Sequence, residues 1–176
     1  MAASSMNKRS RILMVISQLG YGGAEGSFLR LAGFLSRYFD VTIALMARDY
    51  GSSDYSAAQS ETTLPMVMLD GGRHKRSGLL AKALRWWQMV RRLRKLKYEC
   101  DVTISFMSGP NLLNALAGCS TTTILSERGS KRFDTGMSPR LRWIWTRVLD
   151  PLAYRGARFV VTASQGIAEE IGKANP

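Results

Sequence analysis

The sequence of 176 residues has few of the side chains that build metal centres and disulfide frameworks. Its single histidine, His74, excludes a site made of several histidines. Its two cysteines, Cys100 and Cys119, are far apart in the sequence and form no C-x-x-C pattern. We therefore expect no metal site, and two reduced, buried thiols in place of a disulfide.

Long hydrophobic runs are also missing. No eighteen consecutive residues are apolar, so the sequence predicts no helix that spans a bilayer. Near its start only residues 12–16 form an apolar run, which is too short for the hydrophobic part of a signal peptide. We expect a cytoplasmic protein whose only contact with a membrane would be at its surface.

Acidic residues are scarce relative to basic ones. Thirteen Asp and Glu against 25 Lys and Arg give a net charge of +12 and an isoelectric point near 10.3. Such an excess predicts an anionic partner, whether a nucleic acid, a phosphorylated ligand or a membrane surface. The apolar fraction of 45% and the length fit one folded domain.

Short apolar runs alternate with helical patterns along the chain. The runs predict six strands, at 11–17, 40–46, 65–70, 101–107, 121–127 and 158–164. Helices are expected from the glycines after residue 19 to about 38, at 79–98, 111–118 and 138–157, and from 165 onward, with Pro151 kinking the fourth. Residues 1–10 are expected to be a flexible lead.

This alternation predicts an α/β fold, a Rossmann-like doubly wound parallel sheet with helices on both faces. In such sheets the ligand binds beyond the carboxyl ends of the strands. The stretch "LGYGGAEG" follows the first strand and opens the first helix. A dinucleotide fingerprint would need a glycine at position 25, where Glu25 stands, so the spacing disfavours NAD. The glycines either bring backbone N–H groups to a ligand or only shape a tight turn.

The segment "ILMVISQLGYGGAEGSFLRLAGFLSRYFDVTIALM" resembles the opening of a family 4 (GT4-type) glycosyltransferase with the GT-B fold. Three further segments are similar to family elements in the same order: "DVTISFMSGPNLLNALAG", "TTTILSERGS" and "ARFVVTASQGIAEEI". The second of these resembles the I-x-S-E-R-N segment of members that extend lipid-linked oligosaccharides. The resemblance covers residues 11–172. It departs from the family at Gly26, where arginine is frequent, and at Gly129, where asparagine is frequent.

The resemblance implies that residues 11–176 are the N-terminal, acceptor-binding domain of a retaining glycosyltransferase that uses no metal. The intact enzyme would transfer a hexosyl or N-acetylhexosaminyl group from a nucleotide-sugar to a lipid-linked or lipopolysaccharide-type glycan, without a resident cofactor. The nucleotide-sugar domain, with its E-x7-E element, would be missing from this chain. We therefore expect the chain alone to be inactive.

The resemblance and the loop positions together suggest site residues. Gly22 and Gly23 would face the donor phosphates, and Glu25 would either contact the acceptor or satisfy the amides of its own helix. Glu127 would orient the acceptor hydroxyl or accept its proton, and Arg128 would pair with a phosphate. Alternatively, these two residues form structural ion pairs with Lys131 or Asp134. Further acceptor contacts are expected at Ser108, Gly109 and Asn111, whereas Ser164 and Gly166 are expected to shape a turn.

The predicted helix at 79–98 has basic residues and no acidic ones on its polar face. Leu80, Ala83, Leu84, Trp87 and Val90 are predicted to line the apolar face. Contacts with anionic headgroups are predicted for Lys82, Arg85, Trp86, Arg91, Arg92, Arg94 and Lys95. Residues 140–147 have the same basic and aromatic character. This pattern predicts peripheral docking on the inner face of the plasma membrane, although a solvated helix face would share it.

Two other classes of protein remain as alternatives. A nucleic-acid binder would also combine basic residues with aromatics, but no RNP, KH, helix-turn-helix or zinc motif is present. A nucleotide-binding Rossmann protein such as an oxidoreductase would share the fold, but the glycine spacing disfavours it.

Overall fold

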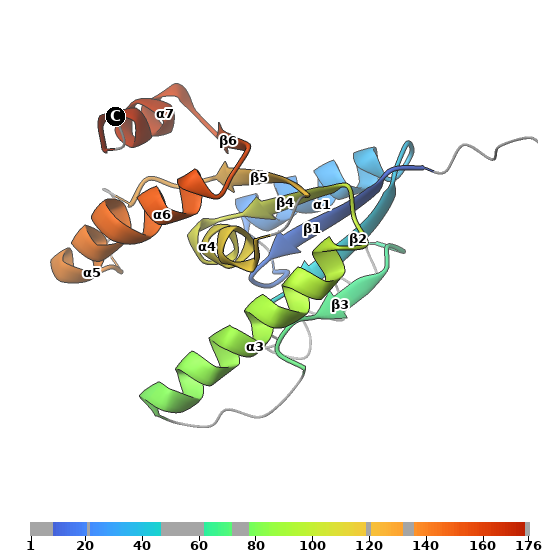
Figure 1. The fold of residues 1–176 in the computed structure, drawn as a ribbon. Coiled ribbons are helices and arrows are strands. Elements are labelled where there is room, and N and C mark those ends of the chain that lie inside the picture. Colours follow the sequence, from blue (N-terminus) through green and yellow to red (C-terminus); the bar gives the residue numbers. More distant parts are fainter. Residues whose placement is uncertain are drawn as a thin grey trace, which may run out of the picture.

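The computed structural model describes residues 9–20, 22–46, 62–71, 78–118, 121–131 and 136–174. They form a six-stranded parallel sheet with helices on both faces, which confirms the predicted fold class (Figure 1). The strands are β1 (Arg11–Ile16), β2 (Asp40–Leu45), β3 (Met66–Met68), β4 (Val102–Phe106), β5 (Thr122–Glu127) and β6 (Phe159–Thr162). The helical elements are α1 (Gly23–Leu35), α3 (Leu79–Lys97), α4 (Ser108–Ala117), α5 (Pro139–Ile144), the π-helical turn η2 (Trp145–Leu149), α6 (Asp150–Arg155) and α7 (Gln165–Ala174).

Several predictions fall on residues outside these ranges: most of the lead at 1–10, and His74, Cys119 and Asp134. Cys100 is described, and it has a partly buried free thiol whose pKa is raised by burial. No described helix is long and apolar enough to cross a membrane.

The strands lie in the order β3-β2-β1-β4-β5-β6. The winding of the chain reverses between β1 and β4, which pair in parallel from Ile12 with Val102 to Val15 with Ser105. Ligands of doubly wound sheets bind at the carboxyl ends of the strands beside such a reversal. The sheet therefore brings the glycine turn after β1, the start of α4 after β4 and the turn after β5 to one edge.

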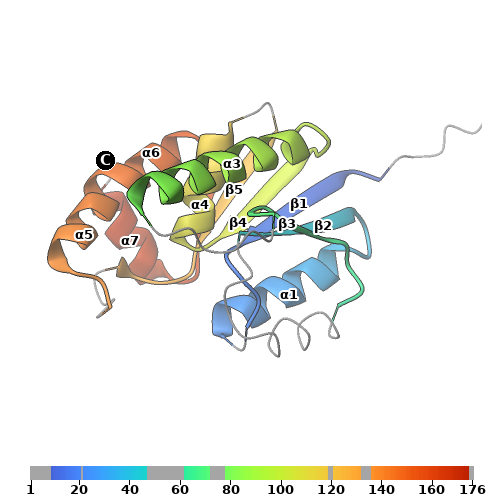
Figure 2. The same ribbon diagram turned by 90° about the horizontal axis from the view of Figure 1, so that it is seen from below.

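Side chains that alternate along the strands fill two apolar layers. The layer under α1 contains Ile12, Met14, Ile16, Phe28 and Ala32. The opposite layer, under α3 and α4, contains Leu13, Val15, Met89, Leu93 and Leu113. Figure 2 shows α1 on one side of the sheet and α3 and α4 on the other. Strand β1 is therefore buried on both faces, which is why its sequence is a continuous apolar run.

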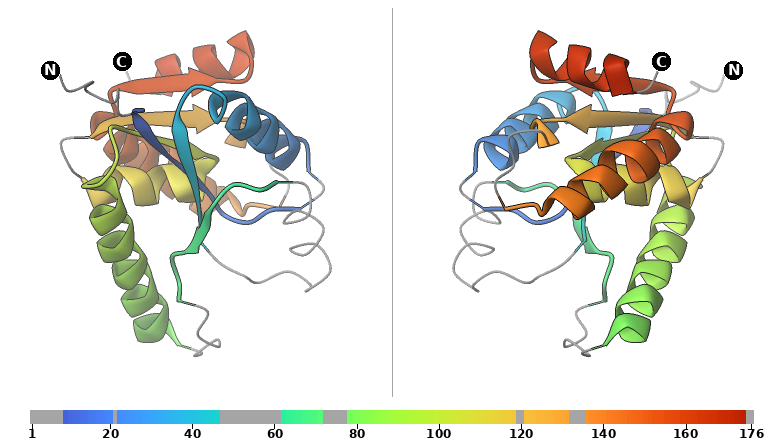
Figure 3. Two further views of the ribbon diagram at one scale, coloured as in Figure 1. Left: turned by 90° about the vertical axis from the view of Figure 1, so that its right-hand side faces the viewer. Right: turned by 90° about the vertical axis from the view of Figure 1, so that its left-hand side faces the viewer.

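Helix α3 packs on the sheet with a different face from the predicted one. Its buried apolar side chains are Met89 and Leu93, with Trp86 and Val90 packed against the same layer. The side chains predicted to lie inside but found exposed are Leu80, Ala83, Leu84 and Trp87. Both faces of the helix carry apolar residues, so periodicity alone did not decide between them. The amino-terminal half of α3 extends away from the sheet, which leaves its apolar residues uncovered (Figure 3).

Helix α4 begins at Ser108, ahead of the predicted start at 111. The sequence Ser108-Gly109-Pro110 suggested a loop. However, proline is tolerated in the first turn of a helix, where its missing N–H would have had no partner within the helix. Ser108 and Gly109 therefore lie in the first turn of α4, directly after the carboxyl end of β4.

Replacing Phe28 by alanine should lower the free energy of unfolding by about 3–5 kcal/mol. Phe28 is fully buried, and its ring meets that of Phe106 edge-on with 5.2 Å between centroids. Phe34 on the same helix is 55% exposed, so Phe34→Ala is the matched control and should cost less than about 1 kcal/mol. Urea unfolding measures both losses. Equal losses would contradict the placement of α1 on the sheet.

Candidate functional site

Glu127, the last residue of β5, places a buried carboxylate at the carboxyl edge of the sheet, where it is 2% exposed. Three groups approach the same oxygen, Oε1. The Asn111 side-chain amide donates to it at 3.0 Å and the Tyr154 hydroxyl at 3.3 Å, and the Lys131 ammonium lies 3.8 Å away. Buried charges require such partners. None of the described residues hydrogen-bonds Oε2, so this oxygen can accept a further hydrogen bond.

Lys131 links Glu127 to a second buried carboxylate. Its Nζ donates to both oxygens of Asp150 at 2.7 Å and lies 5.6 Å from the centre of the Trp145 ring. Burial raises the pKa of the Asp150 carboxyl, and the Lys131 ammonium acts in the opposite direction. The buried Lys131 ammonium therefore lies between the carboxylates of Glu127 and Asp150 and offsets the charge of both.

A small recess opens beside Glu127, with a cavity volume of about 30 Å³, which is room for about one water molecule. Its polar lining consists of Glu127, Ser130, Lys131, Thr146, Asp150, Tyr154 and Glu170. Ile167 and Ile171 of α7 supply an apolar wall, and the Ser130 hydroxyl donates to Glu170. Hydrogen-bonding groups beside an apolar wall suit a single hydroxyl group or a water molecule in a recess of this size. The described residues contain no cluster of three or more His, Cys, Asp or Glu that could hold a metal ion.

The helix predicted at 138–157 is divided by the π-helical turn η2. Pro151 was expected to kink this helix, and η2 ends just before it. Because the proline ring clashes with the carbonyl four residues earlier, a widened turn relieves the crowding. The Asp150 N–H accordingly donates to the Trp145 carbonyl, five residues back. This turn brings Thr146 and Asp150 into the lining of the recess.

The glycine turn lies at the same edge of the sheet. Gly22 is the N-cap of α1 and Gly23 its first residue, and both are exposed. The Glu25 carboxylate folds back and occupies the space where a side chain on Gly22 would lie. Glu25 thus lies near the amino-terminal end of its own helix, but none of the described N–H groups donates to its carboxylate, so both predicted alternatives stay predictions. The predicted contact of Gly22 and Gly23 with donor phosphates stays a prediction.

Asn111 has a different place from the predicted one. It is fully buried, and its amide nitrogen donates to both the Ser126 carbonyl and Glu127, while its oxygen accepts from Ser105. An acceptor glycan could not reach it without displacing these bonds. The sequence pattern missed this because burial of α4 against β4 and β5 is a long-range feature. Ser108 and Gly109 are partly exposed at the edge of the sheet, and their contact with an acceptor stays a prediction.

Arg128 follows Glu127 but turns to the other face of the sheet. Its guanidinium lies over the Phe106 ring, 5.0 Å from the centroid, and is partly exposed. None of the described carboxylates pairs with it. The alternative ion pair predicted for Glu127 exists with Lys131, at 3.8 Å.

The residues predicted to contact a membrane do not all face outward. Trp86 packs against the apolar layer under α3 and α4 and against a further cluster of Leu112, Leu125 and Ala153. The exposed indole on α3 is Trp87, at 59%. Arg85 forms an ion pair with Asp70 at 2.9 Å, and Arg92 donates to the Leu69 carbonyl at 3.1 Å. The remaining predicted basic residues are exposed: Lys82, Arg91, Arg94 and Lys95.

Tyr154 and Asp150 were missed as site residues. They are four residues apart in α6, a spacing that places two side chains on one helix face. That spacing was the available signal, but nothing in the local sequence indicates that this face meets the end of β5.

Solved structures share this fold. HepE from Anabaena, in complex with UDP and glucose, superposes with a TM-score of 0.67 at 19% identity, over 94% of this chain and 41% of that chain. HepE in complex with UDP superposes with a TM-score of 0.63 at 20% identity, over 93% of this chain and 40% of that chain. MurG from Acinetobacter baumannii superposes with a TM-score of 0.59 at 14% identity, over 90% of this chain and 42% of that chain. The chain thus has a GT-B glycosyltransferase fold and spans about two-fifths of the length of these proteins.

No protein-family model matches the sequence, and no curated protein matches it. The likeness to HepE and MurG is therefore a likeness of fold.

The contribution of Tyr154 to stability should disappear in alkali. Burial and the Glu127 carboxylate raise the pKa of the Tyr154 hydroxyl above its ordinary value of 10.0. The native phenol then stays protonated while the unfolded one ionises, so its stabilisation is complete below pH 10 and is lost as the pH rises toward the folded pKa. The difference in unfolding free energy between wild type and Tyr154→Phe should be constant up to about pH 9 and shrink beyond it.

Urea unfolding at a series of pH values measures this difference. Tyr98→Phe, which removes an exposed hydroxyl, is the control. If the difference in unfolding free energy between wild type and Tyr154→Phe stays constant or grows above pH 10, the buried hydrogen bond from Tyr154 to Glu127 is contradicted.

Proposed function

We propose that the chain is the acceptor-binding half of a retaining GT-B glycosyltransferase. The enzyme would transfer a hexosyl or N-acetylhexosaminyl group from a nucleotide-sugar to a glycan carried on a lipid or a lipopolysaccharide core. The observation that supports this most is Glu127, a buried carboxylate with one unbonded oxygen, which lines a recess at the carboxyl edge of the sheet. The same fold in HepE accompanies bound UDP and glucose.

In this proposal Glu127 Oε2 accepts a hydrogen bond from the acceptor hydroxyl. The hydroxyl oxygen bonds to the anomeric carbon on the face from which the nucleoside diphosphate departs, as retention requires, the bond from that carbon to the diphosphate breaks, and the hydroxyl proton passes to Glu127. The backbone N–H groups of Gly22 and Gly23 stabilise the negative charge that develops on the leaving diphosphate, and Arg128 pairs with a phosphate. The Glu25 carboxylate now lies over Gly22, so it must turn aside when the diphosphate binds there.

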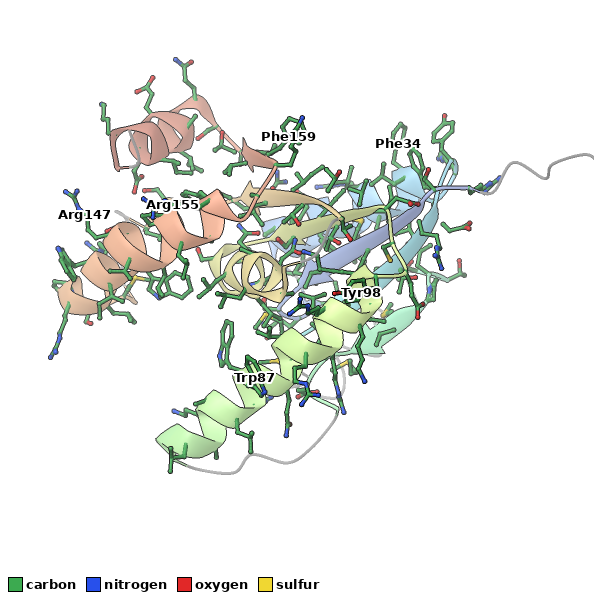
Figure 4. The ribbon with its side chains drawn as sticks, viewed as in Figure 1. Phe34, Trp87, Tyr98, Arg147, Arg155 and Phe159 are labelled. Carbon is green, nitrogen blue, oxygen red and sulfur yellow. The ribbon has the colours of Figure 1, made fainter. Side chains whose placement is uncertain are left out.

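An anionic membrane is the proposed site of action. We call Leu80, Leu84, Trp87, Arg91 and Arg94 the α3 stripe; they lie on one exposed face of the helix. A second exposed surface on α5, η2 and α6 carries Trp143, Leu152, Arg147 and Arg155. Figure 4 shows Trp87 on α3, Arg147 on η2 and Arg155 on α6. Apolar side chains alongside arginines suit the headgroup region of anionic lipid more than a nucleic-acid backbone.

The glycosyltransfer proposal predicts a large effect of Glu127→Gln. In the protein expressed from the complete gene, kcat for transfer from labelled nucleotide-sugars to a lipid extract should fall by about 10²-fold or more. Glu169→Gln is the matched control, because Glu169 is exposed on α7 and accepts only from Gln165, at 3.1 Å. Full activity in Glu127→Gln would remove Glu127 from the mechanism. Steady transfer by the 176-residue chain alone would contradict the assignment to one half of the enzyme.

The membrane proposal predicts selective flotation. The chain should float with phosphatidylglycerol vesicles and not with phosphatidylcholine vesicles, and Trp87→Ala should reduce the bound fraction by about fivefold or more. Phe34→Ala, which removes a comparably exposed aromatic from α1, should have no effect. Equal recovery with both lipids, or binding to RNA that Trp87→Ala leaves unchanged, would count against lipid as the partner.

A further inference from the structure

The last residue of α3 is a buried lysine. Lys97 is 1% exposed, although lysine almost always keeps its ammonium in water. Its Nζ donates to the side-chain oxygen of Asn114 at 2.9 Å, to the Asn114 carbonyl at 3.0 Å and to the Thr123 hydroxyl at 3.0 Å. This ammonium therefore ties α3 to the carboxyl-terminal half of α4 and to β5.

The hydrogen bonds continue from Asn114 to the candidate site. The Asn114 amide nitrogen donates to Ser105 Oγ at 3.1 Å, and Ser105 Oγ donates to the Asn111 oxygen at 2.8 Å. The Asn111 amide nitrogen donates to Glu127 Oε1 at 3.0 Å. The side chains of this path are all buried: Asn114, Ser105, Asn111 and Glu127. We call Lys97, Asn114, Ser105 and Asn111 the amide relay.

The chemistry of the two ends fixes the direction of every bond in the relay. An ammonium only donates, and a carboxylate only accepts. Asn114 must therefore turn its oxygen to Lys97, and Asn111 must turn its nitrogen to Glu127. Ser105 accepts from one amide and donates to the other. Hydrogen bonds aligned in one direction polarise and strengthen one another in a low-dielectric interior.

We propose that the amide relay positions Glu127 for reaction. The buried cation at one end strengthens the donation of Asn111 at the other, and this donation fixes Oε1 toward the protein interior. Oε2 is then the oxygen that meets the acceptor hydroxyl. The relay residues touch no substrate and act only through Glu127, so they are positioning residues. The meeting of Oε2 with an acceptor hydroxyl rests on the proposed function. The coupling of Lys97 to Glu127 along the relay is independent of it.

The coupling can be measured in the 176-residue chain by NMR. Lys97→Met should move the side-chain amide resonances of Asn111 and the carboxyl ¹³C resonance of Glu127, although the three hydrogen bonds of Lys97 named above go to neither residue. Ser105→Ala is a smaller change in the middle of the relay, and it should move the same resonances. It replaces Lys97→Met in the experiment if that variant does not fold. Thr103→Val is the matched control, since it removes a buried hydroxyl on the same strand that has no hydrogen-bond partner among the described residues. Resonances that stay in place, or move equally in Thr103→Val, would overturn the relay.

The positioning role is measured by transfer in the protein expressed from the complete gene. Ser105→Ala should lower kcat about tenfold while the KM for the acceptor changes by less than about twofold. In a Glu127→Gln background the same substitution should have no further effect on kcat, because the relay acts through Glu127. A loss that persists in this background would indicate a general structural effect and overturn the role.

The two measurements separate the failure of this inference from that of the proposed function. NMR coupling with an unchanged kcat in Ser105→Ala would overturn the positioning role and leave the proposed function standing. Absence of transfer by the wild-type protein, with the NMR coupling intact, would overturn the proposed function and with it the positioning role.

Discussion

The hydrogen bond from the Asn111 amide to Glu127 Oε1 is the interaction on which the rest of the site depends. A carboxylate that is 2% exposed would be costly to hold at the end of β5 without donors aimed at it. Asn111 supplies one donor, Tyr154 a second, and the Lys131 ammonium adds charge at 3.8 Å. All three approach one oxygen, and this asymmetry gives the carboxylate an inner and an outer side.

The parallel sheet creates this arrangement because it brings distant segments to one edge. Helix α4 starts where β4 ends and presents Asn111 to the end of the neighbouring strand, β5. The π-helical turn before Pro151 then sets Asp150 against Lys131. Doubly wound parallel sheets bind their ligands at this edge, and the fold alone would leave the chemistry open. The proposal of proton transfer from a hydroxyl rests on the side chains around Glu127 and not on the fold.

The sequence predicted the sheet well because β1, β2 and β4 are buried on both faces, and such burial produces continuous apolar runs. It also pointed to Glu127, since a polar residue directly after a buried run lies at the ligand edge. It did not predict the inward face of α3, because apolar residues occur on both sides of that helix. Nor did it predict the relay, because Asn111 was expected to contact an acceptor and nothing in the sequence indicated that Lys97 is buried. Their roles arise from the packing of α3 and α4 against β4 and β5, which local periodicity does not encode.

Neutron diffraction from deuterium-exchanged crystals of the chain tests the central claim most directly, because it locates the hydrogen atoms of the relay. The structure requires deuterium on the Asn111 amide nitrogen directed at Glu127 Oε1, and deuterium on Ser105 Oγ directed at the Asn111 oxygen. An Asn111 amide turned the other way, with its oxygen toward Glu127, would contradict the account.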